Sequence, residues 1–335
     1  MLLITKVYKK YISSLAILFF ACETAPSSLQ VHQGRALGTS YTIQYKGKAN
    51  QYAQYQKSID SLFQGINQSL STYWPDSDIS KINRGDSLVV VDSHFKKVFR
   101  KATTVWKNTN GFFDPTVGSL VNAYGFGPQK PLARIRVAQL DSLRKLTGWE
   151  KVSLTKNGTI RKDHPDIYLD FNAIAKGYTV DVIANYLSQK GQQNYLVEIG
   201  GEVVAKGISP KFQKAWTVAI DDPQQGAERR FKTTLSLVDE ALATSGNYRK
   251  YRIDSLTGEK YVHSLNPHTG LPVKSSILSA SVRAADCMTA DAYATALMVL
   301  PLEKGQELMA STTNLEAYWI VSQGSTTLEV TTKGW

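Results

Sequence analysis

Residues 167–177 read IYLDFNAIAKG, and this stretch predicts a strand that runs directly into a helix. The apolar run from Ile167 to Phe171 has the length of a short buried strand. Helical spacing follows from Ala173 to Gln189, and Gly191 is a helix stop signal. The sequence therefore places the start of a helix immediately above the end of a strand.

The start of this helix is a candidate binding site for an anion. The amide groups of the first turn and the helix dipole point at whatever lies above the strand end, and Lys176 lies near the same place. A diphosphate suits such a place because it is anionic and needs several hydrogen-bond donors. The alternative is that Asp170 or Asn172 only caps the helix. The sequence contains neither a Walker lysine motif nor G-x-G-x-x-G, so the usual nucleotide-binding folds are not indicated.

Outward from this stretch, helices and strands alternate without the regular rhythm of a parallel α/β fold. Further helical spacing predicts helices over residues 53–70, 94–108, 289–300 and 302–312. Strands are predicted over residues 37–45, 195–199, 202–205, 216–220, 233–238, 276–283, 317–322 and 326–331. Residues 111–131 are rich in Gly, Pro and aromatic residues and predict an ordered loop over a site. We therefore expect an α+β fold of two intimately packed α/β subdomains with mixed or antiparallel sheets.

A second candidate site follows from the segment ADCMTADAYAT, residues 285–295. On a helix, Asp291 and Thr295 are four residues apart and share one face. A carboxylate and a hydroxyl suit Mg²⁺, which leaves other positions for phosphate oxygens and water. Asp286 is expected to cap this helix. The alternative is that Asp291 and Thr295 belong to a solvated face or form a local hydrogen bond.

A third candidate is His263, in the segment YVHSLNPHTG of residues 261–270. Residues 266–270 have the composition of a turn, and His263 lies on the strand that leads into it. A histidine near a diphosphate and a metal ion can accept the proton of a hydroxyl group. The alternative is a purely structural histidine. The sequence shows no His/Cys/Glu cluster with zinc spacing and no G-x-S-x-G elbow.

The amino terminus has the features of an export signal. Three lysines lie in residues 1–10, a stretch of about 11 apolar residues follows, and it ends in Phe-Phe-Ala-Cys at Cys22. This pattern predicts a lipoprotein signal peptide over residues 1–21, a lipid-bearing Cys22, a tether over residues 22–33 and a globular domain over residues 34–335. The alternative is an ordinary signal peptide with an incidental cysteine. Cys287 is the only other cysteine, so an acylated Cys22 leaves no intramolecular disulfide.

The overall charge is basic, with 39 Lys and Arg against 28 Asp and Glu and a formal net charge of +11. A basic protein attracts phosphorylated ligands, anionic membranes or nucleic acid. The lysines and arginines form no block beyond short pairs such as Lys96–Lys97, so no nucleic-acid partner is expected.

Taken together, these segments resemble the ApbE family of FAD:protein FMN transferases. The matching segments are LGTSYTIQY, STYWPDSDISKIN, GFFDPTVGSLVNAYGFGP, YLDFNAIAKGYTVD, VEIGGEV, TSGNYRKY, YVHSLNPHTGLPV and TADAYATALMVL. They occur in the family's order and cover roughly residues 36–300. One departure is Leu37, where the family usually has Met, and it concerns a packing detail.

The resemblance implies a role for individual residues. Mg²⁺ would be held by Asp291, Thr295 and the backbone oxygens of Ala173 and Met288. FAD would be contacted by Leu37, Tyr73, Pro115, Thr116, Val117, Asp170, Lys176 and Ser264. His263 matches the family histidine that is proposed to assist catalysis, with Asp291 or Asp170 as less favoured bases.

The implied reaction transfers FMN from FAD to a Thr or Ser hydroxyl of an acceptor flavoprotein and releases AMP. Membrane redox subunits are plausible acceptors, and the enzyme itself would be a lipoprotein on the periplasmic side of a bacterial membrane. Two alternatives remain open at this point. One is an FAD pyrophosphatase that gives FMN and AMP, and the other is a flavin-binding lipoprotein without turnover.

Overall fold

A computed structural model describes residues 27–225, 228–247, 251–253 and 260–335 of the chain. The predicted signal peptide and Cys22 lie outside the described residues. Within the described part, no helix has the length and apolar character needed to cross a lipid bilayer.

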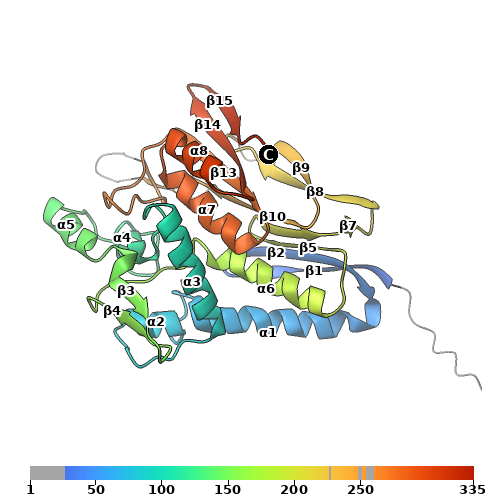
Figure 1. Cartoon of the computed structure of the whole chain (residues 1–335), viewed down its shortest axis with the longest axis horizontal. Coiled ribbons are helices and arrows are strands. Elements are labelled where there is room, and N and C mark those ends of the chain that lie inside the picture. Colours follow the sequence, from blue (N-terminus) through green and yellow to red (C-terminus); the bar gives the residue numbers. More distant parts are fainter. Residues whose placement is uncertain (1–26, 226–227, 248–250, 254–259) are drawn as a thin grey trace, which may run out of the picture.

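The centre of the fold is an antiparallel sheet in the strand order β1-β2-β5-β6-β10-β13-β14-β15 (Figure 1). Its strands are β1 (Ser27–Ala36), β2 (Thr39–Lys48), β5 (Tyr195–Ile199), β6 (Glu202–Lys206), β10 (Glu240–Gly246), β13 (Ile277–Ala284), β14 (Glu316–Gln323) and β15 (Thr326–Thr331). Three smaller sheets complete the fold. Two of them are pairs, β3 (Val152–Leu154) with β4 (Ile160–Lys162) and β11 (Tyr251–Ile253) with β12 (Lys260–Val262). The third has the strand order β7 (Ile208–Ser209), β8 (Lys214–Asp221) and β9 (Phe231–Leu237).

The long helices pack against this sheet and against one another. They are α1 (Tyr52–Leu70), α3 (Ser93–Asn108), α6 (Ala175–Gln189), α7 (Cys287–Val299) and α8 (Leu302–Ser311). Helix α1 shows why its sequence folds this way: Tyr55, Ile59, Phe63, Ile66 and Leu70 recur at helical spacing, and all are buried. Helix α7 is instead buried almost all round, because it lies between α6, α3, β10 and β13.

A second lobe holds the remaining helices, α2 (Asp78–Asn83), α4 (Gly118–Ala123) and α5 (Val137–Lys145), with the β3–β4 hairpin (Figure 1). One continuous apolar core joins the two lobes, from Trp149 and Ile160 beside the hairpin to Trp319 in the large sheet. The prediction of an α+β fold with intimately packed subdomains is therefore confirmed.

The prediction of a strand from Ile167 to Phe171 is wrong, because the segment is largely buried but pairs with no other strand. Its backbone groups find other partners: Asn83 bonds both the N–H and the carbonyl of Leu169, and the Asp170 N–H donates to the Pro115 carbonyl at 2.8 Å. The loop predicted over residues 111–131 also differs, since it contains the short helix η2 (Pro115–Val117) and α4. Asp114 caps η2, and Pro115 at its first position favours the turn.

The predicted tether also needs correction, because residues 27–33 belong to β1. Ser27 pairs with Lys48 and Ala36 with Thr39, so β1 is the edge strand of the large sheet. His32 is fully buried in this strand between Tyr45 and Tyr52. The polar composition of the segment hid the strand, since its buried positions are occupied by Gln30 and His32.

Candidate active site

The starts of α6 and α7 meet at one close contact. The N–H of Gly177, in the first turn of α6, donates to Oδ2 of Asp291 on α7 at 2.9 Å. A Cβ on Gly177 would overlap the Cys287 carbonyl and lie 2.8 Å from the Asp291 Cβ, so only glycine permits this approach. Two segments separated by more than a hundred residues are thereby joined.

Burial and neighbouring charges shape the electrostatics of Asp291. Burial raises its pKa, while Lys176 and the Gly177 N–H oppose that effect by stabilising the ionised form. Within the described residues, the other carboxylate oxygen, Oδ1, forms no hydrogen bond. Asp291 therefore offers one oxygen to a ligand while the second oxygen anchors the start of α6.

Lys176 forms a close ion pair with Glu202, the first residue of β6. Glu202 is 2% exposed, and its Oε2 atom has no hydrogen-bond partner. Burial raises the pKa of Glu202, with Lys176 opposing and Asp291 adding to the rise. Burial disfavours the charge of Lys176, but the two carboxylates outweigh it and raise the lysine pKa. One ammonium group cannot neutralise two carboxylates, so a net negative charge remains here and favours a further cation.

Strand β10 connects α7 to the segment of His263. The Thr295 hydroxyl lies 3.3 Å from the Ser245 hydroxyl, and two residues further along the chain Asn247 accepts a hydrogen bond from Ser264 at 2.7 Å. Ser264 is buried and follows the half-buried His263 directly. The predicted metal residue Thr295 and the predicted catalytic residue His263 therefore belong to neighbouring segments of one site.

Asp170 lies on the other side of the α6 start. Both of its carboxylate oxygens accept hydrogen bonds from Asn172, at 2.7 and 3.1 Å, and burial raises its pKa against these bonds. The capping alternative is wrong, because the N-cap of α6 is Ile174 and no side chain caps the helix. Asp170 instead holds the turn that precedes α6. This turn also contains Ala173, whose backbone the resemblance assigns to the metal.

The Pro115–Val117 segment abuts Asp170 but has little side-chain chemistry to offer. Thr116 is fully buried; its hydroxyl donates to Asp114 at 2.5 Å and accepts from the Gly148 N–H at 2.7 Å. Any ligand contact from this segment must therefore come from its backbone and from Val117.

An aromatic bridge joins Tyr73 to His263. The Tyr73 side chain is 59% exposed, and its hydroxyl lies 3.5 Å from the Phe126 carbonyl oxygen. The Phe126 ring in turn meets the His263 ring edge-on, with 6.3 Å between centroids. Burial of its hydroxyl and the nearby Asp170 charge raise the pKa of Tyr73. These contacts place Tyr73, Asp170 and His263 around a shared region.

Leu37 lies in the β1–β2 turn and adopts a left-handed backbone conformation with φ 51°, which is unfavourable for a branched side chain. Its side chain packs against the apolar cluster of β2, α1 and α6. The turn lies beside the β5–β6 turn, where the Gly200 N–H donates to the Ser40 carbonyl at 3.0 Å and which Glu202 follows.

Two carboxylates hold the start of α7. Asp286 caps the helix by accepting from the Thr289 N–H at 2.8 Å, as predicted, and Asp181 accepts from the N–H groups of Cys287 and Met288, each at 2.8 Å. Burial raises the pKa of Asp181 to about 7 against these two bonds. Met288 is therefore held in a fixed position beside Asp291.

The described residues contain no group of three or more His, Cys, Asp or Glu side chains arranged to hold a metal ion. The predicted magnesium site does not require such a group, because Mg²⁺ accepts one or two carboxylates and completes its shell with waters and phosphate oxygens. The available Oδ1 oxygen of Asp291 and the excess of negative charge around Lys176 fit a divalent cation.

Comparison with known proteins identifies the family of this chain. The family model of the ApbE family matches residues 37–319. A flavin transferase ApbE from Vibrio cholerae is 34% identical and superposes with a TM-score of 0.82, over 92% of this chain and 98% of that one. An apo-form flavinyl transferase ApbE from Pseudomonas stutzeri is 29% identical with a TM-score of 0.80, over 92% and 95%. An FAD:protein FMN transferase from Haemophilus influenzae is 34% identical over 92% of this chain and 90% of its own length.

The chain belongs to the ApbE family.

Two residues of this candidate site, Glu202 and Phe126, were not predicted from the sequence. Glu202 lies in the matched segment VEIGGEV, but its position after a Gly-Gly turn gave no sign that it pairs with Lys176. Phe126 lies in the matched segment GFFDPTVGSLVNAYGFGP, where any of several aromatic residues could line a site. Only the three-dimensional contacts single these two residues out.

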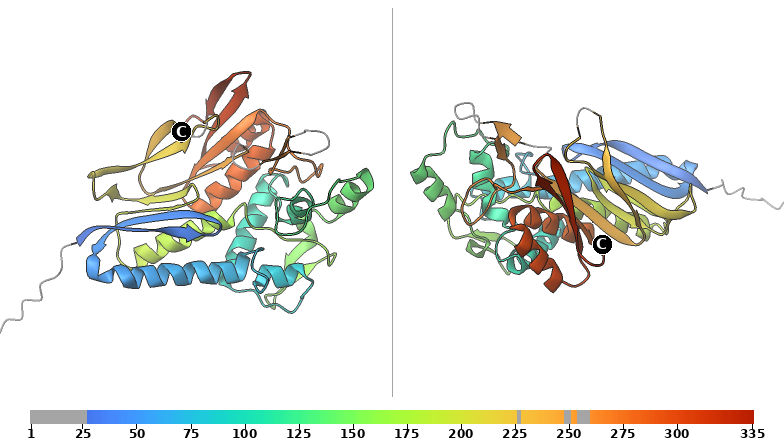
Figure 2. Two further views of the ribbon diagram at one scale, coloured as in Figure 1. Left: turned by 180° about the vertical axis from the view of Figure 1, so that it is seen from behind. Right: turned by 90° about the horizontal axis from the view of Figure 1, so that it is seen from above.

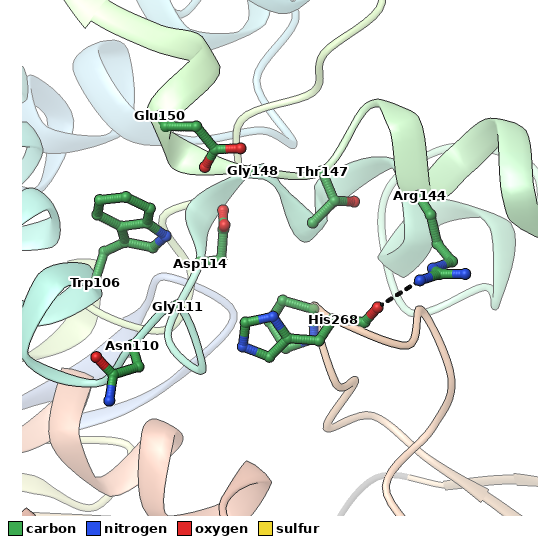
Figure 3. A pocket seen from close by; sticks show the side chains of 10 residues that line it. Trp106, Asn110, Gly111, Asp114, Arg144, Thr147, Gly148, Glu150 and His268 are labelled. Atoms are coloured by element: carbon green, nitrogen blue, oxygen red, sulfur yellow. Dashed lines mark hydrogen bonds between the residues drawn. The ribbon is translucent and has the colours of Figure 1, made fainter.

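A separate cavity of about 340 Å³ lies beside this ApbE-family site, and none of the predicted site residues lines it (Figure 3). Its lining includes Trp106, Asp114, Glu150 and His268. The Arg144 guanidinium donates to the His268 carbonyl at 3.0 Å across one side of it. The cavity therefore marks the place where α5 fastens the turn that follows His263.

Proposed function

We propose that this chain transfers FMN from FAD to a Thr or Ser hydroxyl of an acceptor flavoprotein and releases AMP. The observation that carries the proposal is the Gly177–Asp291 hydrogen bond, which unites the predicted diphosphate site with the predicted metal site. The names of the related proteins from Haemophilus influenzae and Vibrio cholerae support the same reaction.

The residues present fit a magnesium ion at this junction. Its ligands would be Oδ1 of Asp291, the Thr295 hydroxyl and the backbone oxygens of Ala173 and Met288. A bound Mg²⁺ neutralises the diphosphate and stabilises the charge that develops on the leaving AMP.

The chain's own groups position the substrate. Glu202 fixes the Lys176 ammonium, which leaves the remaining N–H donors of Lys176 for phosphate oxygens. The exposed ring of Tyr73 and the Phe126 ring supply flat apolar surfaces for the flavin ring system. We assign further FAD contacts to Leu37, Asp170, Ser264 and the backbone of residues 115–117.

Catalysis then needs a base and good alignment. His263 accepts the proton of the acceptor hydroxyl as its oxygen forms a bond to the FMN-side phosphorus. The bond between that phosphorus and the bridging oxygen breaks, and AMP leaves with that oxygen. Positioning supplies much of the rate, since a small displacement of an aligned group costs about 10²-fold.

Export and anchoring are part of the same proposal. Cys22 would bear a lipid that holds the enzyme on the periplasmic side of a bacterial membrane, near exported membrane redox subunits. Membrane fractionation tests this: the wild-type chain should partition with membranes, and Cys22→Ser should lose its covalent lipid by mass spectrometry. An unmodified Cys22 in the mature wild-type protein would contradict the anchor.

The reaction is tested by incubating the protein with FAD, Mg²⁺ and a candidate acceptor, followed by intact-mass measurement. We expect the acceptor to gain one FMN unit, and Asp291→Ala or removal of Mg²⁺ to slow transfer by about 10³-fold. His263→Asn should slow it by about 10²–10³-fold. Asp141→Ala, on the exposed face of α5, is the matched control and should leave the rate unchanged.

Three other outcomes of this assay would contradict the proposal in different ways. An unchanged acceptor with AMP still released would indicate the pyrophosphatase. FAD that stays intact with Mg²⁺ present would indicate a flavin-binding lipoprotein. Full transfer by Asp291→Ala would contradict the proposed site itself.

A further inference from the structure

One end of the molecule has a cluster of lysines, which we call the basic edge. It consists of Lys46 and Lys48 at the end of β2, Lys190 after α6, Lys206 at the end of β6, and Lys211 and Lys214 around the β7–β8 turn. Within the described residues, none of these six lysines forms an ion pair.

The backbone holds these segments side by side. The Lys46 N–H contacts the Asn194 carbonyl at 3.4 Å, and the Asn194 side chain accepts from the Ile208 N–H at 2.8 Å. Lys206 pairs with Tyr195 across the β5–β6 ladder. Asp239 is an acidic residue at this edge, and its carboxylate accepts from the Gly207 N–H at 3.0 Å. The lysines therefore outnumber the nearby acidic groups on one contiguous surface.

An exposed aromatic ring lies within the basic edge. Phe212, in the β7–β8 turn, is 61% exposed, and Ile208 beside it is 39% exposed. The ammonium groups of Lys211 and Lys214 lie 5.1 and 5.8 Å from the Phe212 ring centroid. A ring flanked by long cationic side chains suits the boundary between lipid headgroups and acyl chains, where the ring enters and the ammonium groups meet phosphates.

The same end of the molecule receives the chain from its amino terminus. Ser27, the first described residue, pairs with Lys48 at the outermost position of the β1–β2 ladder. The three views agree that the start of β1 and the β7–β8 end lie together (Figures 1 and 2). Five residue steps separate Cys22 from Ser27 and span at most about 18 Å. A lipid on Cys22 would therefore bring the basic edge to the membrane surface.

We infer that the basic edge docks on an anionic lipid surface, with Phe212 inserted among the headgroups and the lysines on lipid phosphates. This inference rests on the proposed lipid anchor for its geometry but not on the proposed reaction. Each lysine near an anionic surface strengthens binding by about fivefold. The contact would fix how the anchored enzyme is oriented, which a lipid on Cys22 alone does not.

The test uses the mature chain with Cys22→Ser, so that no acyl chain contributes to binding. Co-sedimentation is measured with vesicles of 30% phosphatidylglycerol in phosphatidylcholine and with phosphatidylcholine alone. We expect the triple variant Lys46→Gln, Lys211→Gln, Lys214→Gln to bind the anionic vesicles at least tenfold more weakly. Phe212→Ala should also weaken binding, and raising the salt to 0.5 M should abolish most of it.

The matched control removes three exposed lysines from the opposite lobe, as Lys130→Gln, Lys145→Gln, Lys156→Gln. It has the same net charge as the first triple variant and should keep its affinity for the anionic vesicles. Equal losses for both triple variants, or equal binding to both kinds of vesicle, would overturn the inference. Far-UV circular dichroism and thermal unfolding, unchanged in both variants, verify that each is folded, and neither measurement depends on the proposed reaction.

Hydrogen exchange on the acylated wild-type chain provides an independent measurement. On anionic vesicles, the amides of residues 211–214 should exchange more slowly than in detergent micelles. The β14–β15 turn, on the other edge of the large sheet, should exchange equally in both. Equal exchange of residues 211–214 in the two environments would also overturn the inference.

Discussion

The junction of α6 and α7 and the basic edge use charge in opposite ways. At the junction, Asp291 and Glu202 are 3% and 2% exposed, and they share Lys176 with little access to water. At the basic edge, the lysines keep their hydration. Burying charge costs several kcal/mol per ion unless partners compensate it, whereas exposed charges cost almost nothing. The buried cluster therefore must be arranged residue by residue, while the exposed cluster needs only the right sign.

This contrast predicts that substitutions at the junction disturb the fold, and that substitutions at the basic edge do not. The largest effect is expected for Gly177→Ala, because the added methyl group overlaps the Cys287 carbonyl and the Asp291 Cβ. We expect a loss of about 3 kcal/mol in the free energy of unfolding, measured by urea titration. Gly65→Ala in α1 is the control, since its nearest neighbour is His94 at 4.0 Å, and alanine favours a helix. Equal stability of the two variants would refute the close contact.

A smaller loss is expected when the charge between the two carboxylates is removed. Lys176→Met leaves Glu202 and Asp291 without their shared cation and should cost about 2 kcal/mol, less than for a fully buried pair because Lys176 is 32% exposed. Glu202→Gln in the same protein should restore more than half of this loss. Urea unfolding of the two single variants and the double variant measures the coupling, and additive losses would argue against it.

A dependence of stability on pH is expected from His32, a buried histidine near the basic edge. Burial lowers the pKa of His32, although the hydrogen bond that its Nδ1–H donates to Gln56 Oε1 and the Asp60 charge oppose this. Below its ordinary pKa of about 6.5, His32 binds more protons in the unfolded chain than in the folded chain, so its contribution to stability falls as pH falls. The buried carboxyls Asp181 and Glu202, whose pKa is raised to about 7, contribute slopes of the opposite sign. The contribution of His32 is therefore read from the difference between wild type and His32→Gln, which should approach about 1.4 kcal/mol per pH unit. An unchanged slope between pH 7 and pH 5.5 would contradict this.

The smallest effect is expected at the basic edge itself. The triple change Lys46→Gln, Lys211→Gln, Lys214→Gln should alter the free energy of unfolding by less than about 0.5 kcal/mol, because these residues form no ion pairs with other described residues. Thermal unfolding in the absence of vesicles measures this. A loss near that of Lys176→Met would remove the distinction between the two regions.

The same contrast explains how far sequence reasoning reached. Helices such as α1 and α3 were predicted within a few residues, because repeated apolar spacing is a local property. Residues 167–171 were predicted wrongly as a strand. An apolar run does not reveal whether its backbone bonds a neighbouring strand or, as here, Asn83 and Pro115. Strand β1 was hidden because a buried histidine and glutamine replaced the expected apolar residues.

The candidate site shows the same limit. Asp291 and Lys176 were identified from the sequence because each lies near the start of a predictable helix. Asp170 was identified although the strand expected around it is not formed. Glu202 and Phe126 were not, since their importance arises from contacts with residues far away in the chain. Leu37 was named only through family resemblance, and its left-handed backbone became visible in the fold.

Helix α6 gives the proposed orientation a length scale. Its first turn contains Lys176 and Gly177 of the candidate site, and its last turn leads into Lys190 at the lysine-rich end. Fifteen helical residues extend over about 22 Å. An enzyme resting on lipid headgroups would hold its proposed reaction centre roughly 22 Å above the membrane surface. Acceptor domains would then have to raise their modifiable hydroxyl to the same level, which selects among neighbouring proteins by geometry as well as by local sequence.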